Sequence, residues 1–266
     1  AAAYIESLRS ETMGADFQRP EKEHLYGILP PSISHEGYSA HPAYSNWDNL
    51  FAMKGLDDVV AAATVLESPE LPRLTAQRDS FHACLMASMA RSMQHHGIDF
   101  IAGAADLGDF DATSTTIGLD PADRLQELPQ ALKATFERYW QFFRQRRDGE
   151  ISWENYTPYE WRTVGALVRL GEVGRAHQAL DYFMRDRRPR HWNHWAEVIW
   201  RNPLETRFIG DAPHGWVGSD FLRSVRNLFV YESGNTLVLA KGIKPDWFDQ
   251  GIAVKNLPTH FGRLSY

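Results

Sequence analysis

The feature that most constrains the fold is a spacing of apolar residues at the period of an α-helix, which recurs along most of the 266-residue chain. The two such segments that meet at Gly171 are typical of an antiparallel helical hairpin. Boundaries estimated from this periodicity hold to within a few residues. We expect helices at about 1–13, 46–66, 73–95, 123–147, 158–170, 173–186, 191–200 and 218–231.

The pattern changes after Ser233, where short runs of alternating apolar residues are separated by Gly and Pro. Strands are expected within 235–243, 251–257 and 261–266. The fold class predicted is therefore mainly α, with a small C-terminal β segment. We expect a helical-hairpin domain over 1–233, and a β-rich segment over 234–266 that packs on it or begins a further β-domain.

Composition excludes several classes of function. The net charge is −6 and no long basic run is present, so nucleic acid is not an expected partner. No apolar run reaches the length of a membrane span, and the first ten residues do not form a signal peptide. Cys84 is the single cysteine, which rules out an intrachain disulfide.

The stretch 191–221 combines four tryptophans and three histidines with two glutamates and two aspartates. A hydrophobic core needs the indoles without the charges, and a solvated surface needs the reverse. The mixture indicates a partly enclosed site for a polar, ring-shaped ligand. Sugars fit this description, because their C–H faces stack on indole and their hydroxyls bind acids and histidines.

Two acidic residues stand where helix caps are expected. Ser45 and Asp48 have the spacing of a capping box. Thr157 is a cap candidate with Pro158 as the first helical residue, and Glu160 is placed to reach back to it. Capping is the simpler interpretation of both acids, and a role in ligand binding is the alternative.

Glu197 is expected in the middle of a helix, between Trp195 and Trp200. A carboxylate among indoles loses hydration unless it is paired, which favours the protonated form that a general acid needs. The alternative is an ordinary salt bridge, for which Arg201 is the nearest candidate. Asp211 lies in a loop rich in Gly and Pro, where a turn carboxylate that binds its own backbone is the alternative to a functional acid.

Metal binding is not favoured by the spacing of the histidines. On the expected helix, His191, His194 and Glu197 spread too far round the circumference to chelate one ion easily, and no HExxH pattern is present. His95 and His96 are interpreted as partners of a helix C-terminus. Phosphate-loop, dinucleotide and Gly-x-Ser-x-Gly motifs do not occur. We expect no catalytic metal and no cofactor.

An ordered set of motifs resembles the bacterial six-hairpin glycosidases, the glucoamylase-like (α/α)6 toroids. The motifs are GILPPSISHEGY, SNWDNLFAMKGL, GDFDATSTT, YTPYEWR, HWAEVIWR, IGDAPHGWVGSDFLRSV and GIAVKNLPTHFGRLSY. The resemblance implies helical hairpins in a ring, with a carbohydrate site in a central funnel and helix starts at its rim. The periodicity indicates fewer helices than six hairpins need, so the ring would be incomplete in this chain.

The resemblance implies a glycoside hydrolase that acts on an oligosaccharide or polysaccharide in a secreted or periplasmic location. Glycoside cleavage needs a proton donor and a second carboxylate that flank the bond. Glu197 with Asp109 is the first choice for this pair, and Glu160 and Asp211 are held in reserve. Asp109 and Asp111 are also alternatives for capping a short helix. Expected substrate contacts are Trp47, Asp48, His35, Glu36, Asp111, Arg162, Trp195, His214 and Trp216.

Other classes of function remain open at the level of sequence. The indoles are equally compatible with a non-catalytic carbohydrate-binding module. The stretch 165–180 resembles one hairpin of a helical-repeat interaction protein, although no second copy follows at a fixed period. A polysaccharide lyase with a Tyr or His base is a further option. The sequence does not specify the sugar, the linkage or the stereochemical outcome.

Overall fold

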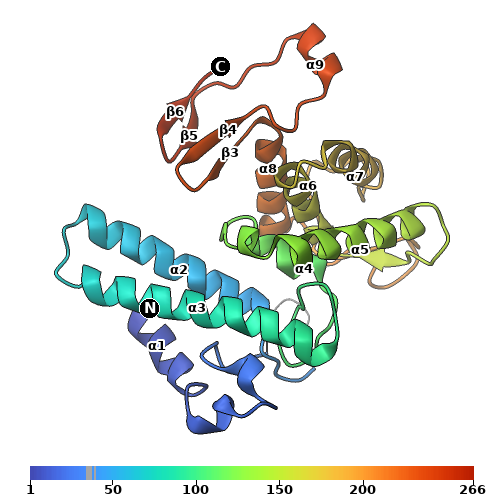
Figure 1. Ribbon diagram of the computed structural model, residues 1–266. Coiled ribbons are helices and arrows are strands. Elements are labelled where there is room, and N and C mark those ends of the chain that lie inside the picture. The colour runs from blue at the N-terminus through green and yellow to red at the C-terminus, as the bar shows by residue number, and fades with distance from the viewer. Residues whose placement is uncertain (34–37, 39) are drawn as a thin grey trace. The chain divides into compact units, whose positions relative to one another are not determined.

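The computed structural model describes residues 1–33, 38 and 40–266, which form two compact units (Figure 1). Unit 1 comprises Ala1–Glu137 and unit 2 comprises Arg138–Tyr266. The chain is mainly helical with small C-terminal strands, as the sequence predicts. Residue 233, the expected domain boundary, lies inside unit 2, where strand β3 follows helix α8 without a break. Within the described ranges, no helix is long and apolar enough to cross a membrane.

Unit 1 is organised by the hairpin of α2 and α3, which lie side by side in Figure 1. Ser45 caps the start of α2, and Gly97 ends α3 in the left-handed region at φ 64°. Leu50 and Met53 of α2 and Leu85 of α3 are fully buried. The elements that begin in this unit are α1 Ala2–Ser10, η1 Ala15–Gln18, η2 Glu23–Leu25, α2 Asn46–Val65, α3 Leu71–His96, α4 Ala112–Thr115, η3 Thr116–Gly118, η4 Leu125–Glu127 and α5 Pro129–Arg147.

Unit 2 is built on α6, which packs against both α7 and α8. Gly171 adopts φ 82° between α6 and α7, so the predicted hairpin is confirmed. Gly165 allows the close approach of α8, because a Cβ there would stand 2.8 Å from Asn227 Nδ2. The elements are β1 Asn155–Tyr156, η5 Pro158–Glu160, α6 Trp161–Arg169, α7 Val173–Arg185, β2 Ile199–Trp200, α8 Gly215–Phe229, β3 Val230–Ser233, β4 Thr236–Leu239, α9 Pro245–Gln250, β5 Leu257–Thr259 and β6 Gly262–Leu264.

The small sheets are all antiparallel and two-stranded in the part of the chain that the structure describes. They pair β1 with β2, β3 with β4 and β5 with β6. Strands expected within 235–243 and 261–266 are confirmed as β4 and β6. The strand expected over 251–257 is wrong for most of its length, because β5 begins only at Leu257. The sequence analysis also missed α9, whose Pro245 occupies the first turn.

The helix expected over 191–200 is also wrong. Residues 197–200 run antiparallel to 208–211 instead, with hydrogen bonds from Glu197 N to Asp211 O at 2.9 Å and from Gly210 N to Val198 O at 2.8 Å. Trp195 is buried against Trp161 of α6. Pairing with residues 208–211 and burial of this indole outweigh the helical spacing, which is a weak preference by itself. Glu197 therefore lies on a non-helical segment that leads into β2.

Candidate functional site

Asp109 lies on the loop that joins α3 to α4, and both oxygens of its carboxylate accept hydrogen bonds. Oδ1 accepts from the backbone N–H of Ala104 at 2.9 Å, and Oδ2 accepts from the hydroxyl of Tyr38 at 2.7 Å. The backbone of the loop is fixed by a hydrogen bond from Gly103 N to Asp109 O at 3.0 Å and by a β-bridge between Ala102 and Phe110. The carboxylate is thus held in one orientation by groups from two segments.

Gly103 provides the space in which these groups meet. A Cβ at this position would stand 2.5 Å from the Tyr38 hydroxyl, 2.8 Å from Asp111 Cβ and 2.9 Å from Asp109 Oδ2. Tyr38, Asp109 and Asp111 therefore converge above one glycine backbone. Burial, and then the hydrogen bond to Asp109, raise the pKa of Tyr38 well above its usual value, so the phenol stays protonated and donates.

Asp111 is the acid that caps α4. Its carboxylate accepts from Ser114 N at 3.0 Å and also binds the Ser114 hydroxyl. Burial, assisted by the charge of Asp109, raises the pKa of Asp111, although the hydrogen bonds from Ser114 act in the opposite direction. Two neighbouring carboxyl groups with unequal environments result, which is the arrangement from which acid and base roles arise.

The first turn of α2 lies against the backbone of residues 102–104. Asn46 N donates to Gly103 O at 2.8 Å, and the Asn46 side chain donates to Ala102 O at 2.9 Å. The starts of α2 and α4 therefore meet on segment 102–104. The cap at Ser45 is confirmed by a bond from Asp48 N at 3.4 Å, but the Asp48 carboxylate accepts from Ser32 Oγ, 16 residues away.

Trp47 is 4% exposed and meets Phe51 edge to face at 4.8 Å between ring centroids. An indole that is buried to this degree offers little area for stacking on a sugar. His35 and Glu36, the other expected contacts in this part of the chain, lie outside the described residues.

In unit 2, Glu197 and Asp211 stand opposite each other on the paired segments 197–200 and 208–211. The salt bridge considered for Glu197 does not form, because Arg201 binds Asp186 at 3.0 Å and the Tyr182 hydroxyl at 2.7 Å. Among side chains that the structure describes, the Glu197 carboxylate has no hydrogen bond or ion pair.

A pocket of about 580 Å³ in unit 2 contains Trp195 and His214 in its wall, together with His194 and Phe221. Its volume is in the range of small-molecule sites. His214 also caps α8 by accepting from Val217 N at 3.4 Å. The expected contacts Trp195 and His214 are thus brought together although they are 19 residues apart.

Arg162 and Trp216 form a second group in unit 2. The guanidinium of Arg162 lies over the Tyr159 ring at 4.4 Å and over the Trp216 ring at 5.8 Å. It also binds Asp220 at 2.7 Å through Nε. Trp216 is 40% exposed, so part of its indole is accessible to a ligand.

Glu160 does not complete the predicted capping box. Its carboxylate binds Arg146 through both oxygens, at 2.7 and 2.8 Å, and accepts from Tyr139 at 3.0 Å. The Thr157 cap is present, with Tyr159 N donating to its hydroxyl at 3.4 Å. The geometry gives Glu160 a structural partner on both oxygens, and it leaves little room for proton transfer.

Sequence reasoning missed Tyr38, Gly103 and Arg146. Tyr38 and Asp109 are separated by 71 residues, and nothing in the local pattern links them. A Gly in a loop carries many interpretations, so Gly103 gave no signal of its own. Comparison with protein-family models, with curated proteins and with solved structures found no match for this chain.

Proposed function

We propose that the protein is a glycoside hydrolase in which Asp109 and Glu197 are the catalytic carboxylates. The proposal includes the toroidal arrangement: the hairpins α2–α3 and α6–α7 are two of the hairpins of an (α/α)6 ring. Two observations within the units support the arrangement. Each hairpin is formed by consecutive, packed helices, and the starts of α2 and α4 meet on one backbone segment.

The observation that carries the proposal is the convergence of Asp109, Asp111 and Tyr38 above Gly103. The phenol of Tyr38 and the backbone N–H of Ala104 hold the Asp109 carboxylate in one orientation, as a base or nucleophile requires. Asp111 adds a neighbouring carboxyl whose pKa is raised by burial. The group is suited to stabilising positive charge on a sugar ring during cleavage.

Glu197 is assigned as the second carboxylate of the pair, the proton donor. Its carboxylate is half-buried and has no partner among the described side chains, so it is available to a substrate. Asp211 stands opposite and is the alternative second acid. Nearby in sequence, Trp195 and His214 line the pocket that a sugar ring would enter.

The test is hydrolysis of a panel of aryl glycosides and oligosaccharides by the full chain. The variants are Asp109→Asn, Glu197→Gln and Asp211→Asn, with the exposed Asp99→Asn as a matched control. Loss of general acid or base assistance costs about 10²–10⁴-fold in rate. We expect losses of this size for Asp109→Asn and Glu197→Gln, full activity for Asp99→Asn, and melting temperatures near that of the wild type for Glu197→Gln.

Each outcome has a definite meaning. If the wild type binds oligosaccharides without cleaving any of them, the protein is a carbohydrate-binding module. A product with a double bond in the sugar ring would replace hydrolysis by lyase chemistry. If Glu197→Gln cleaves at the wild-type rate while Asp211→Asn does not, Asp211 takes the place of Glu197.

A further inference from the structure

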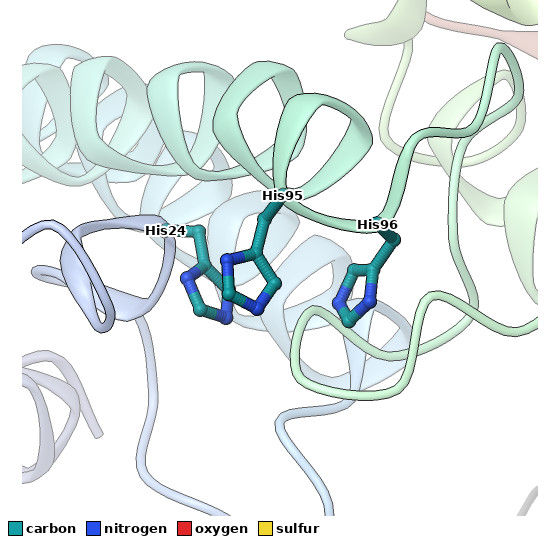
Figure 2. Close-up of side chains that lie close together, drawn as sticks. All are labelled: His24, His95 and His96. Carbon is teal, nitrogen blue, oxygen red and sulfur yellow. The ribbon is translucent and has the colours of Figure 1, made fainter.

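Three histidines from two distant segments gather in unit 1, as Figure 2 shows. His24 belongs to η2, and His95 and His96 are the last two residues of α3. One ring nitrogen from each can be chosen so that all three lie within 4.8 Å of one another. η2 is held against α3 by Ser88, whose hydroxyl donates to His24 O at 2.5 Å. The backbone therefore fixes the cluster.

We propose that His24, His95 and His96 form a site for a zinc ion or a similar divalent transition metal. Imidazole nitrogens are preferred ligands of Zn²⁺, and three histidines with an open fourth position are a known coordination set. The proposed ion is separate from the carboxylates of the hydrolase proposal and does not depend on them.

Two of the rings are already arranged as ligands. His96 Nε2 lies 3.0 Å from Ala105 O, so this nitrogen carries the proton and the lone pair of Nδ1 is available. Metal-bound histidines usually donate their second N–H to a carbonyl or carboxylate in this way. His24 is 4% exposed, and its Nδ1 has no hydrogen-bond partner among the described residues. A buried polar atom without a partner is costly, and a metal ion would satisfy it.

The third ring, that of His95, can rotate to complete the three metal ligands. His24 and His95 are stacked, with centroids 4.1 Å apart and planes 18° from parallel, so their lone pairs do not yet converge. Bonds of 2.0–2.1 Å in a tetrahedral site require nitrogen atoms about 3.4 Å apart. His95 is exposed, so a rotation of its side chain can provide this change without moving the backbone.

The position of the site indicates what the ion would do. The His96 ring fits against Gly108, where a Cβ would stand 2.4 Å from the ring Cγ. Gly108 and Ala105 belong to the loop that carries Asp109. An ion here would join η2, the end of α3 and, through His96, this loop. The role assigned is therefore structural.

Zn²⁺ titration calorimetry and Co²⁺ absorption on the full, chelator-treated chain at pH 7.5 provide the test. We expect one Zn²⁺ per chain, a visible Co²⁺ band of a tetrahedral nitrogen site and a higher melting temperature with Zn²⁺. Mutating a residue that merely supports a metal ligand typically costs about 10–100-fold in metal affinity. Loss of a ligand should cost at least as much, so His95→Gln should weaken Zn²⁺ binding at least tenfold. The control His82→Gln, on the same helix and paired with Glu127, should bind like the wild type.

His95→Gln removes an exposed ring and should leave the fold intact, so its failure to bind cannot be attributed to unfolding if its melting temperature without metal matches that of the wild type. Absence of Zn²⁺ binding to the wild type would overturn the proposal, and the cluster would then be packing of neutral rings. Equal weakening by His82→Gln, or undiminished binding by His95→Gln, would overturn it as well.

Discussion

Replacing Glu160 by Gln should destabilise the protein strongly, because it leaves a buried guanidinium without its counter-ion. Arg146 and Glu160 have side chains only 7% and 9% exposed. The guanidinium is enclosed by the rings of Phe142 and Trp153, each 4.1 Å away, so it cannot turn toward water without losing both contacts. Gln retains one acceptor oxygen but places an NH₂ group where the second oxygen accepted a hydrogen bond.

The expected cost follows from the burial of the pair. Removing one partner of a buried ion pair costs about 3–5 kcal/mol. For a chain of this size class, 1 kcal/mol corresponds to about 2–4 °C in melting temperature, so the expected fall is about 6–20 °C. Asp148→Asn provides the matched control, because the Arg147–Asp148 pair is partly exposed and should contribute little.

Calorimetric or circular-dichroism melting of four proteins separates loss of the buried ion pair from a general loss of packing. These are the wild type, Glu160→Gln, Arg146→Met and the double variant. Replacing both members of a buried pair by uncharged groups is often nearly neutral. The double variant should therefore recover most of the stability that Glu160→Gln loses. If the two single costs simply add in the double variant, or if Glu160→Gln melts within 2 °C of the wild type, the buried pair is not what stabilises this region.

Two further predictions concern stability. Burial raises the folded-state pKa of Asp111 above its usual value, so the charged form is disfavoured in the folded chain and stability is lost as pH rises through the folded pKa. Asp111→Asn cannot ionise, and its melting temperature relative to the wild type should rise from pH 4 to pH 7; a constant difference would contradict this. Gly165→Ala should lose about 1–3 kcal/mol by crowding Ser224 of α8, whereas Gly55→Ala, with open space around it, should gain about 0.5–1 kcal/mol in the same urea titrations.

Much of the helical framework could be predicted from the sequence. Helices α2, α3, α6 and α7 lie close to the ranges expected for them, and Ser45 and Gly171 mark a start and a turn as predicted. These features depend on interactions within a few residues: the period of apolar side chains, a cap that binds the next turn, and a glycine that accepts positive φ. The acids Asp109 and Asp111 were also found as candidates by their place before a short helix.

The tertiary structure decided which groups those candidates meet. Tyr38 reaches Asp109 across 71 residues, and His24 meets His95 across a similar separation. Segment 191–200 has a helical spacing, and nevertheless its last four residues, 197–200, pair with 208–211. Local patterns record how one segment can fold by itself, whereas hydrogen bonds, ion pairs and burial between distant segments arise only when the chain packs. Tertiary packing therefore decides which groups a carboxylate or an imidazole contacts, and with them its chemistry.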